Sequence, residues 1–364
     1  MPQIRKIELF GTHQSMGEAF GEQFRSEIKQ FTEIRIERLC QFVQIFQPNR
    51  SVTRQEILDV AKEMLPAHRV YQSSIWDEFA GIAESSGLSA EELLITNGLT
   101  DIRDFVLLQG MPDSDTHLGE CTAFVVPAQC TTGQTIVGQT WDMHADAIDF
   151  TVIVHRKPVG APQTLCLTTV GCLCLVGVNS DGVAVGNSNL TPMDSQVGVN
   201  YLFTITHALQ QSTASAAADA IVRTPRLSGH NFYVADSETA INLECTATKH
   251  HRTDVEATPF IHANHYLSES FQRMDFKRDN TNSVWRQDAL TQHLNSLKQP
   301  LTPEMCWDQL GKVSQDCVPC EQAQEDSSRT DPATVATLVL CPAERQIDIC
   351  SGSTASGSRQ RITL

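Results

Sequence analysis

Apolar residues in the first third of the chain recur at the spacing of an amphipathic helix. They fall in two runs that share this spacing: Met16, Phe20, Phe24 and Ile28, followed by Phe31, Ile34, Leu39 and Phe42. Such a pattern places one apolar face along a helical surface. The sequence therefore predicts either one long helix or two consecutive helices in this region.

Further helices are predicted by start and stop signals. Thr53 and Glu56 have the spacing of a capping box at the start of a helix over residues 53–64. A helix over 76–86 is expected to stop at Gly87, and Ser89 with Glu92 marks the next helical start. The first third of the chain is thus expected to be helical.

After residue 120 the pattern changes to short runs rich in Val, Thr and Cys, separated by turn signals such as "TTG" and "NSDG". These runs predict an antiparallel sheet, and the later segments alternate in blocks of helices and strands. Blocks of this kind favour α+β layers over alternating βαβ units. The expected strands are 122–127, 134–140, 150–155, 163–170, 172–178, 182–186, 231–235, 240–245, 334–340 and 346–350. The expected helices are 199–210, 213–223, 283–297 and 303–313.

Length and charge narrow the class of protein. The chain has 364 residues, which allows two domains or one large layered domain, and its formal net charge is −16. Binding to nucleic-acid phosphates requires clustered Lys and Arg, so the acidic balance argues against a nucleic-acid partner. We expect a small-molecule partner instead.

The sequence also indicates a compartment. Its first nine residues, "MPQIRKIEL", lack the apolar run of a signal peptide, and no stretch of 18 residues is free of polar groups. These features predict a cytoplasmic protein without a membrane partner. The 12 cysteines are then expected to be thiols rather than disulfides.

A metal site is the less favoured interpretation of the cysteines. Cys317 and Cys320 have ligand spacing, but the obvious second pair, Cys341 and Cys350, is separated by eight residues of strand-like sequence. A redox CxxC would be expected at a helix start within a βαβ unit, which this pattern lacks. We therefore expect neither a metal nor another cofactor.

Three short stretches are candidates for chemistry. "GECTAF" places Cys121 at the start of a strand, "GQTWDMH" ends a strand with Trp141 and Asp142, and "IHANHYL" contains Asn264 and His265. Taken singly, each has an ordinary structural explanation: a core thiol, an Asp that caps a turn, an Asn in a turn. Taken together, a thiol, a carboxylate and a side-chain amide are the parts of a cysteine acyl-transfer site.

With "GVNSDGVAVGNSNL" between the second and third of them, these stretches resemble, in this order, the acyl-coenzyme A:6-aminopenicillanic acid acyltransferases, which are cysteine N-terminal nucleophile hydrolases. The resemblance covers most of the chain and includes "SVWRQDAL". It implies a four-layer αββα sandwich of two antiparallel sheets. It also implies a helical N-terminal segment over 1–120 and a catalytic region over 121–364, in one integrated globule.

The resemblance further implies that the precursor cuts itself between Glu120 and Cys121. This would leave chains of 120 and 244 residues that stay together. Cys121 would be the nucleophile, and its new α-amino group, whose ordinary pKa is about 8, would take the thiol proton. Asp142 aligns with the family's active-site aspartate, and Asn264 with the asparagine whose side-chain NH₂ contributes to the oxyanion hole.

Four other residues are expected at the substrate pocket: Trp141, Asn189, His265 and Glu321. Two positions depart from the family's pattern. Glu120 stands where glycine is common before the nucleophile, and Glu321 stands where the family often has an arginine after a cysteine. Loss of that arginine implies a substrate different from the penicillin nucleus.

The resulting hypothesis is a cysteine amidohydrolase that cleaves the amide of a small acylated amine or amino acid through a Cys121 thioester. One alternative is an acyltransferase that moves an acyl group from a coenzyme A thioester or an amide to an amine. Another is an unprocessed binding protein without catalytic activity, which Glu120 and Glu321 would favour. The sequence leaves substrate identity and any homo-oligomer open.

Overall fold

Two β-sheets form the centre of the molecule. A computed structural model of the chain describes residues 3–47, 49–108, 121–276, 279–316, 332–355 and 357–364. The larger sheet has the strand order β1-β4-β5-β6-β7-β8-β9-β10. Its strands are β1 (Arg5–Gly11), β4 (Thr151–Pro158), β5 (Thr164–Thr169), β6 (Val176–Asn179), β7 (Ala184–Leu190), β8 (Gly229–Ala235), β9 (Ala240–Cys245) and β10 (His250–Asp254).

The smaller sheet has the order β11-β2-β3-β12-β13-β14. Its strands are β11 (Phe260–His262), β2 (Thr122–Val126), β3 (Ile136–His144), β12 (Pro332–Cys341), β13 (Gln346–Ser351) and β14 (Gln360–Thr363). The two sheets face one another, since β2 and β3 contact β7. Strand β2, which begins directly after Cys121, therefore lies at the interface between the sheets.

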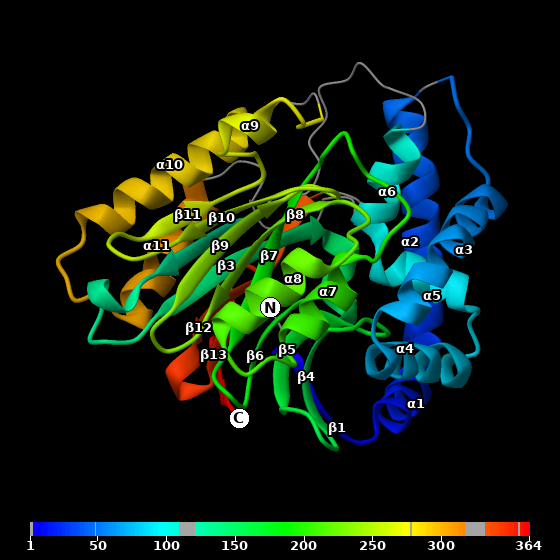
Figure 1. The fold of residues 1–364 in the computed structure, drawn as a ribbon, viewed down its shortest axis with the longest axis horizontal. Coiled ribbons are helices and arrows are strands. Elements are labelled where there is room, and N and C mark those ends of the chain that lie inside the picture. Colours follow the sequence, from blue (N-terminus) through cyan, green and yellow to red (C-terminus); the bar gives the residue numbers. More distant parts are fainter. Residues whose placement is uncertain (1–2, 48, 109–120, 277–278, 317–331, 356) are drawn as a thin grey trace.

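Helices cover the outer faces of both sheets. On the larger sheet, α7 (Tyr201–Ala208) contacts β7, and α8 (Ala214–Arg223) contacts β8 and β9. On the smaller sheet, α10 (Thr281–Ser296) contacts β11, and α11 (Pro303–Asp316) contacts β3 and β12. A short helix, α9 (Glu269–Gln272), precedes α10. The predicted α+β sandwich with αββα layers is confirmed (Figure 1).

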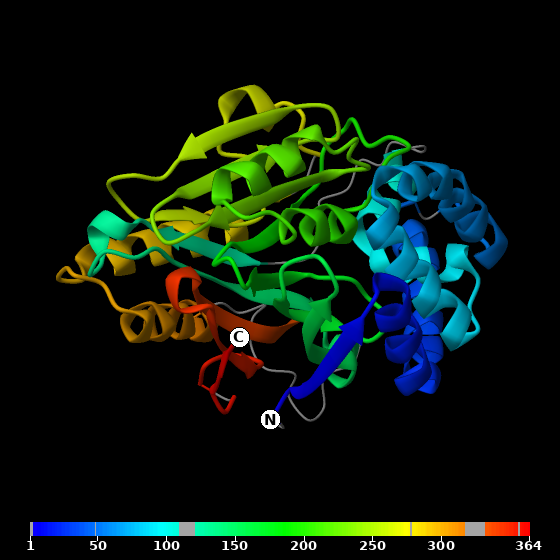
Figure 2. The ribbon, with the colours of Figure 1, turned by 60° about the horizontal axis from the view of Figure 1, so that its bottom comes forward.

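Most predicted elements of the N-terminal third are present. The helices are α1 (His13–Gln23), α2 (Arg25–Phe46), α3 (Arg54–Tyr71), α4 (Ser73–Ser86), α5 (Ala90–Asn97) and α6 (Leu99–Leu108). Both predicted capping boxes form, at Thr53 with Glu56 and at Ser89 with Glu92. Gly87 ends α4 in the left-handed conformation, with φ of 70°. These helices lie together at one end of the sandwich, coloured blue to cyan in Figure 2.

One element of this region was not predicted. Residues Arg5–Gly11 form strand β1, which pairs in parallel with β4 at the edge of the larger sheet, while the other pairs in both sheets are antiparallel. Ile7 and Leu9 are buried and their neighbours are exposed. The segment before residue 121 is therefore not wholly helical, because this short run is held by a partner distant in the sequence.

Glycines allow α1 and α4 to approach closely. A Cβ atom on Gly17 would lie 2.1 Å from the carbonyl oxygen of Glu78, and one on Gly81 would lie 2.6 Å from that of Gln14. Both distances are far below van der Waals contact, so a side chain at either position would push the helices apart.

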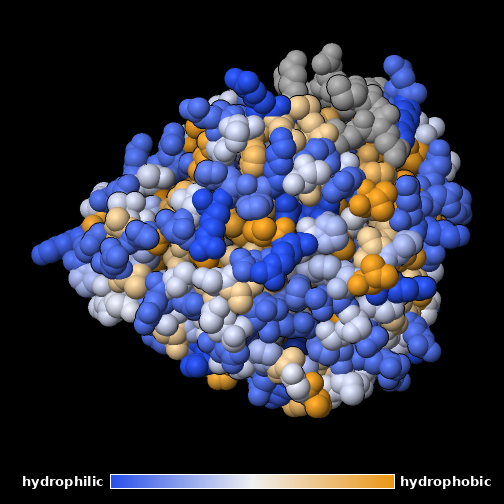
Figure 3. Space-filling model, viewed as in Figure 1, coloured by the Kyte–Doolittle hydropathy of each residue, from blue (hydrophilic) through white to orange (hydrophobic). Residues whose placement is uncertain are grey.

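The N-terminal helices and the sandwich share a core. The largest cluster of buried apolar residues includes Phe20 and Phe31 from the helices together with Val152 and Val176 from the larger sheet. Hydrophobic residues on the face shown in Figure 3 are dispersed in small groups among hydrophilic ones. In the described part of the chain, none of the helices has the length and hydropathy needed to span a bilayer.

Candidate active site

Strand register brings Asn264 to Cys121. Strand β11 pairs with β2 so that His262 lies opposite Ala123. Two residues further in the same antiparallel register, Asn264 is level with Cys121. The backbone N–H of Cys121 donates a hydrogen bond to Oδ1 of Asn264 over 2.6 Å. The nitrogen that would become the α-amine is thus held by a side-chain amide.

Arg286, on α10, connects these two residues. Its Nη1 donates to the carbonyl oxygen of Cys121 over 2.6 Å and to the hydroxyl of Thr122 over 2.7 Å, while its Nη2 donates to Asn264 Oδ1 over 3.1 Å. The side chain of Arg286 is only 1% exposed. Its Nε donates to Oδ1 of Asn282 over 2.7 Å. A buried guanidinium with this set of partners holds the Cys121 carbonyl and the Asn264 amide in place.

The orientation of the Asn264 amide follows from its partners. Its Oδ1 faces two donors, Cys121 N–H and Arg286 Nη2, and its Nδ2 donates to the carbonyl oxygen of Asn189 over 3.0 Å. A flipped amide would set nitrogen against nitrogen and oxygen against oxygen. Nδ2 carries a second proton, for which the described residues offer no acceptor in hydrogen-bond range.

Asp142 is connected to the start of β2 through a hydroxyl. The hydroxyl of Thr140 accepts the N–H of Thr122 over 3.1 Å and donates to Oδ2 of Asp142 over 3.1 Å. Across the ladder, β12 has an irregularity between Thr334 and Ala336, opposite Asp142 and Trp141. Such a bulge changes the direction in which nearby side chains point, and bulges are common beside active sites.

A pocket opens beside Cys121. Four of the residues predicted for the site line it together: Cys121, Trp141, Asp142 and Asn189. The remaining lining residues are Thr100, Met143, Leu175, Asn187, Tyr201 and His230. Most of the wall is contributed by β3, β7 and the N-terminal end of α7. The pocket therefore lies between the two sheets, next to the N-terminal helices.

Two side-chain amide oxygens in this wall have no hydrogen-bond partner in the described parts of the chain. They are Oδ1 of Asn187 and Oδ1 of Asn189, both fully buried. An unsatisfied buried amide oxygen costs about 1–3 kcal/mol. Bound substrate that presents an N–H group would recover this free energy, so the wall is suited to an amide ligand.

The other predicted pocket residues lie elsewhere or outside the described residues. His265 does not line the pocket: its Nδ1 is 2.8 Å from the hydroxyl of Ser283 on α10. That hydroxyl also accepts the backbone N–H of Asn264, so His265 supports the loop that carries Asn264. Glu120 and Glu321 lie outside the described residues.

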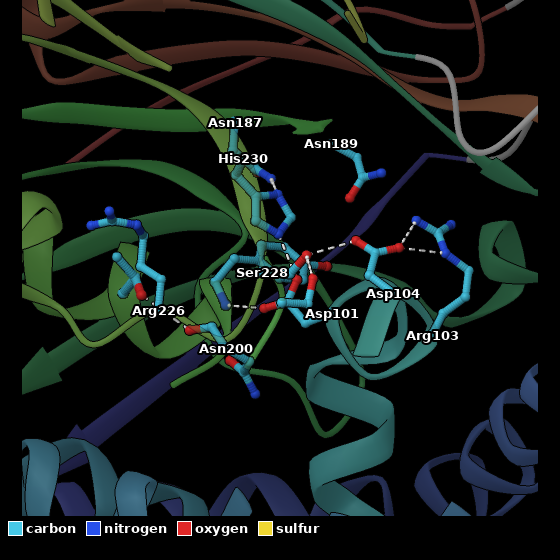
Figure 4. Close-up of polar contacts among 12 residues, drawn as sticks. Asp101, Arg103, Asp104, Asn187, Asn189, Asn200, Arg226, Ser228 and His230 are labelled. Atoms are coloured by element: carbon cyan, nitrogen blue, oxygen red, sulfur yellow. Dashed lines mark hydrogen bonds and ion pairs between the residues drawn. The ribbon is translucent and has the colours of Figure 1, made fainter. Parts of the chain in front are cut away.

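A polar network joins helix α6 to the wall of the pocket (Figure 4). Asp101 accepts from Nε2 of His230 over 2.6 Å and from the backbone N–H of Tyr201 over 3.0 Å. Asp104 accepts from the hydroxyl of Ser228 over 2.7 Å. Its other oxygen, Oδ1, binds Arg103. Burial raises the pKa of Asp104, and the charge of Arg103 opposes this rise.

Comparison with known proteins identifies the family. The family model described as acyl-coenzyme A:6-aminopenicillanic acid acyl-transferase matches residues 130–356, more than half of the chain. The chain belongs to this family. The matched range contains Asp142, Asn189 and Asn264, and it begins nine residues after Cys121.

Several solved structures are similar to this member of the acyl-transferase family. A Caenorhabditis elegans N-acylethanolamine-hydrolyzing acid amidase ortholog is 17% identical, with a TM-score of 0.44 over 61% of this chain and 93% of that one. Penicillin V acylase from Agrobacterium tumefaciens is 12% identical, with a TM-score of 0.43 over 67% of this chain and 86% of that one. A mutant conjugated bile acid hydrolase from Clostridium perfringens is 10% identical, with a TM-score of 0.46 over 67% of this chain and 92% of that one.

The sequence did not predict that Arg286 belongs to the site of this acyl-transferase family member. Val284 and Trp285, the two residues before it, are each 41% exposed, whereas Arg286 is buried. A polarity pattern assigns the apolar pair to the core and the arginine to solvent, which is the reverse of what is found. The quoted resemblance of "SVWRQDAL" to the family was the only signal, and it did not specify a role.

No metal-binding group is found in the described ranges, where no three His, Cys, Asp or Glu side chains are arranged to hold an ion. Cys317 and Cys320 lie outside these ranges. The ten described cysteines are free thiols. Burial raises the pKa of several of them, including Cys172 to about 11 and Cys306 to about 12, which keeps these thiols protonated and unreactive.

Proposed function

We propose that this protein is an autoprocessed cysteine amidohydrolase that cleaves a small acylated amine or amino acid through a thioester on Cys121. The observation that carries the proposal is the hydrogen bond from the Cys121 nitrogen to Asn264, at the edge of the pocket between the sheets. Membership of the acyl-transferase family supports the class of reaction.

Self-cleavage is the first step of the proposal. The Cys121 sulfur attacks the carbonyl carbon of Glu120, and the bond from that carbon to the Cys121 nitrogen breaks as the nitrogen takes a proton. Water then hydrolyses the thioester, which returns the thiol of Cys121 and leaves Glu120 with a carboxylate. The hydrogen bond to Asn264 holds the departing nitrogen as it becomes an amine.

The same groups then act on substrate. The free amine of Cys121 takes the thiol proton, and the thiolate attacks the substrate carbonyl. The second proton of Asn264 Nδ2 stabilises the oxyanion, and Asn187 and Asn189 accept the substrate N–H. The ammonium returns its proton to the leaving amine, and water releases the acid from the thioester.

Arg286 favours the neutral form of the new amine. Its guanidinium binds the carbonyl of Cys121 and the same Asn264 oxygen that holds the Cys121 nitrogen. A positive charge this close disfavours a second positive charge on the amine. The amine is therefore a stronger candidate for the base near neutral pH, and no histidine partner is needed.

Acyl transfer is the second candidate, because the family model is described as a transferase. The two reactions share the thioester and differ in whether water or an amine attacks it. A panel of acylated amines, incubated with and without a competing amine, separates them. Free acid without added amine supports hydrolysis, and a product that forms only with the amine supports transfer.

Intact mass and denaturing gel electrophoresis test the proposal directly. We expect chains of 120 and 244 residues and covalent labelling of Cys121 by a thiol-directed acylating probe. Cys121→Ala should abolish both. The matched control is Cys40→Ala, which removes a half-buried thiol on α2 and should leave both unchanged. A single intact chain that resists the probe would instead support the non-catalytic binding protein.

A further inference from the structure

A second pocket lies beside the one at Cys121, and its wall contains a buried arginine. Its lining includes Arg35 from α2 together with Thr96, Thr168 and Thr169. The two pockets are adjacent, because they share four lining residues: Trp141, Met143, Leu175 and Tyr201.

The Arg35 side chain has little to compensate for its burial. It is 4% exposed, and its Nε has no hydrogen-bond partner in the described parts of the chain. Its guanidinium carbon lies 4.5 Å from the centre of the Phe31 ring, which stabilises the charge on one face only. Burial lowers the pKa of Arg35, against the attraction of Asp146.

The carboxylate that attracts Arg35 is already engaged. Asp146 accepts hydrogen bonds from Arg38 through Nε over 3.3 Å and Nη2 over 3.0 Å. Two guanidinium groups therefore face one carboxylate, which leaves a local excess of positive charge beside the pocket. A buried cation without a full set of partners is destabilising unless an anion joins it.

The rest of the wall suits an anion with an apolar chain attached. Tyr201 supplies a hydroxyl group, and burial raises the pKa of Tyr201, so this hydroxyl stays protonated as a donor. Trp141, Met143 and Leu175 supply an apolar surface that continues to the Cys121 pocket. A carboxylate, with its two coplanar oxygens, matches the planar donors of arginine.

We propose that Arg35 binds a carboxylate of the substrate, so that the preferred substrate is an amide that also carries a carboxylate group. This inference rests on the proposed function for the identity of the Cys121 pocket. The residue belongs to the segment before Cys121 and is distinct from Glu321, where the family often has an arginine. The acidic chain would thus recognise an acidic small molecule through one buried cation.

A binding experiment tests the arginine independently of catalysis. The probe is hexanoate, which contains no amide, and hexanol of the same chain length is the neutral comparison, both measured by calorimetry. We expect hexanoate to bind the wild-type protein and to lose about tenfold or more in affinity in Arg35→Met and in Arg35→Gln. Hexanol should bind all three proteins alike.

Controls separate this effect from misfolding. Arg25→Met removes an exposed charge from the same helix and should leave hexanoate binding unchanged. Thermal unfolding and far-ultraviolet circular dichroism test whether each variant is folded. If Arg35→Met does not fold, the polar variant Arg35→Gln is used in its place. Equal hexanoate affinity in the wild-type protein and a folded variant would overturn the proposal, as would no binding to the wild-type protein.

Turnover then tests substrate choice. For an acyl amino acid and its methyl ester, the ratio of kcat/KM, acid over ester, should fall about tenfold or more in Arg35→Gln and stay constant in Arg25→Met. An unchanged ratio would overturn the proposal. If no amide is cleaved by any of the proteins, the proposed function fails, while the hexanoate result still decides whether Arg35 binds carboxylates.

Discussion

Arg286 Nη2 donates a hydrogen bond to Asn264 Oδ1, the same oxygen that accepts the Cys121 N–H. The guanidinium, the amide and the nucleophile's nitrogen therefore form one unit. Among the described residues Arg286 does not line the pocket and acts through its contacts with Cys121 and Asn264, so we assign it a positioning role.

Replacement of Arg286 should impair catalysis through this unit. We expect Arg286→Gln to lower kcat/KM about 10²–10³-fold, the range seen when a preorganised donor is lost. The acid limb of the pH profile should also move to higher pH, because an amine without a positive neighbour keeps its proton more firmly. Steady-state kinetics across pH provide the measurement.

Arg286→Lys is the matched control, since it keeps the charge and loses the two-pronged contact. It should lower kcat/KM while the acid limb stays near that of the wild-type enzyme. If the limb moved equally in both variants, the charge of Arg286 would have no role in setting the base.

Substitutions of Asn264 can separate the role of its amide oxygen from that of its amide nitrogen. Asn264→Asp keeps an acceptor for the Cys121 nitrogen and for Arg286, but it has no donor for an oxyanion. Loss of one such donor costs about 3–4 kcal/mol at the transition state. We expect about a 10²–10³-fold drop in kcat for Asn264→Asp, measured on cleaved protein.

Asn264→Ala removes the acceptor as well, so self-cleavage should slow in this variant more than in Asn264→Asp. The time course of chain cleavage, followed by gel after rapid synthesis, distinguishes the two. Equal cleavage rates in both variants would show that the hydrogen bond to the Cys121 nitrogen does not assist self-cleavage.

The fold was largely predictable because local patterns and start signals were intact. The capping boxes at Thr53 and Ser89 and the strand runs after residue 120 needed no distant partner to be recognised. Strands β1, β10 and β14, which the local pattern did not predict, did need one: they form by pairing with β4, β9 and β13. Local sequence carries little of that information.

The sequence predicted most of the residues at the site, but it did not predict the hydrogen bonds that join them. The resemblance led to Cys121, Trp141, Asp142 and Asn189, which line one pocket. It did not lead to Arg286, because a buried arginine beside exposed Trp285 reverses the usual polarity of a helix. Nor did it reveal Arg35, whose helix shows an ordinary amphipathic pattern from sequence alone.

The contact between α6 and β8 should hold the two chains together after cleavage. Asp101 binds His230 Nε2 and the backbone N–H of Tyr201, all within the core. Removal of one partner that leaves a buried donor without an acceptor typically costs about 1–3 kcal/mol. We therefore expect Asp101→Ala to release the 120-residue chain at a lower urea concentration than wild type requires.

Size-exclusion chromatography in increasing urea gives the measurement. The control is Asp219→Ala, which breaks an exposed i,i+4 pair with Arg223 on α8 and should shift the release point little. Identical release points for Asp101→Ala and the control would mean that the contact with β8 does not hold the chains together.

His68 should make stability depend on pH. It is fully buried on α3, where its Nδ1 lies 2.9 Å from the carbonyl oxygen of Met64 and its Nε2 accepts the N–H of Asn200 over 3.0 Å. Burial lowers its pKa from 6.5 to about 4. The unfolded chain therefore binds a proton between these values that the folded chain does not, so stability is full above pH 6.5 and falls as pH drops towards 4. A shift of this size corresponds to about 3 kcal/mol.

His68→Gln removes the titrating group, so it should flatten the decline in the free energy of unfolding between pH 6.5 and pH 4. Urea titrations of the uncut Cys121→Ala protein, with and without His68→Gln, measure this as a difference in slope against pH. His250→Gln removes an exposed histidine on β10 and should leave the slope unchanged. Only the neutral form of His68 can accept the Asn200 N–H, so protonation of His68 breaks this hydrogen bond. If His68→Gln kept the full slope, a group other than His68 would be responsible for the loss of stability.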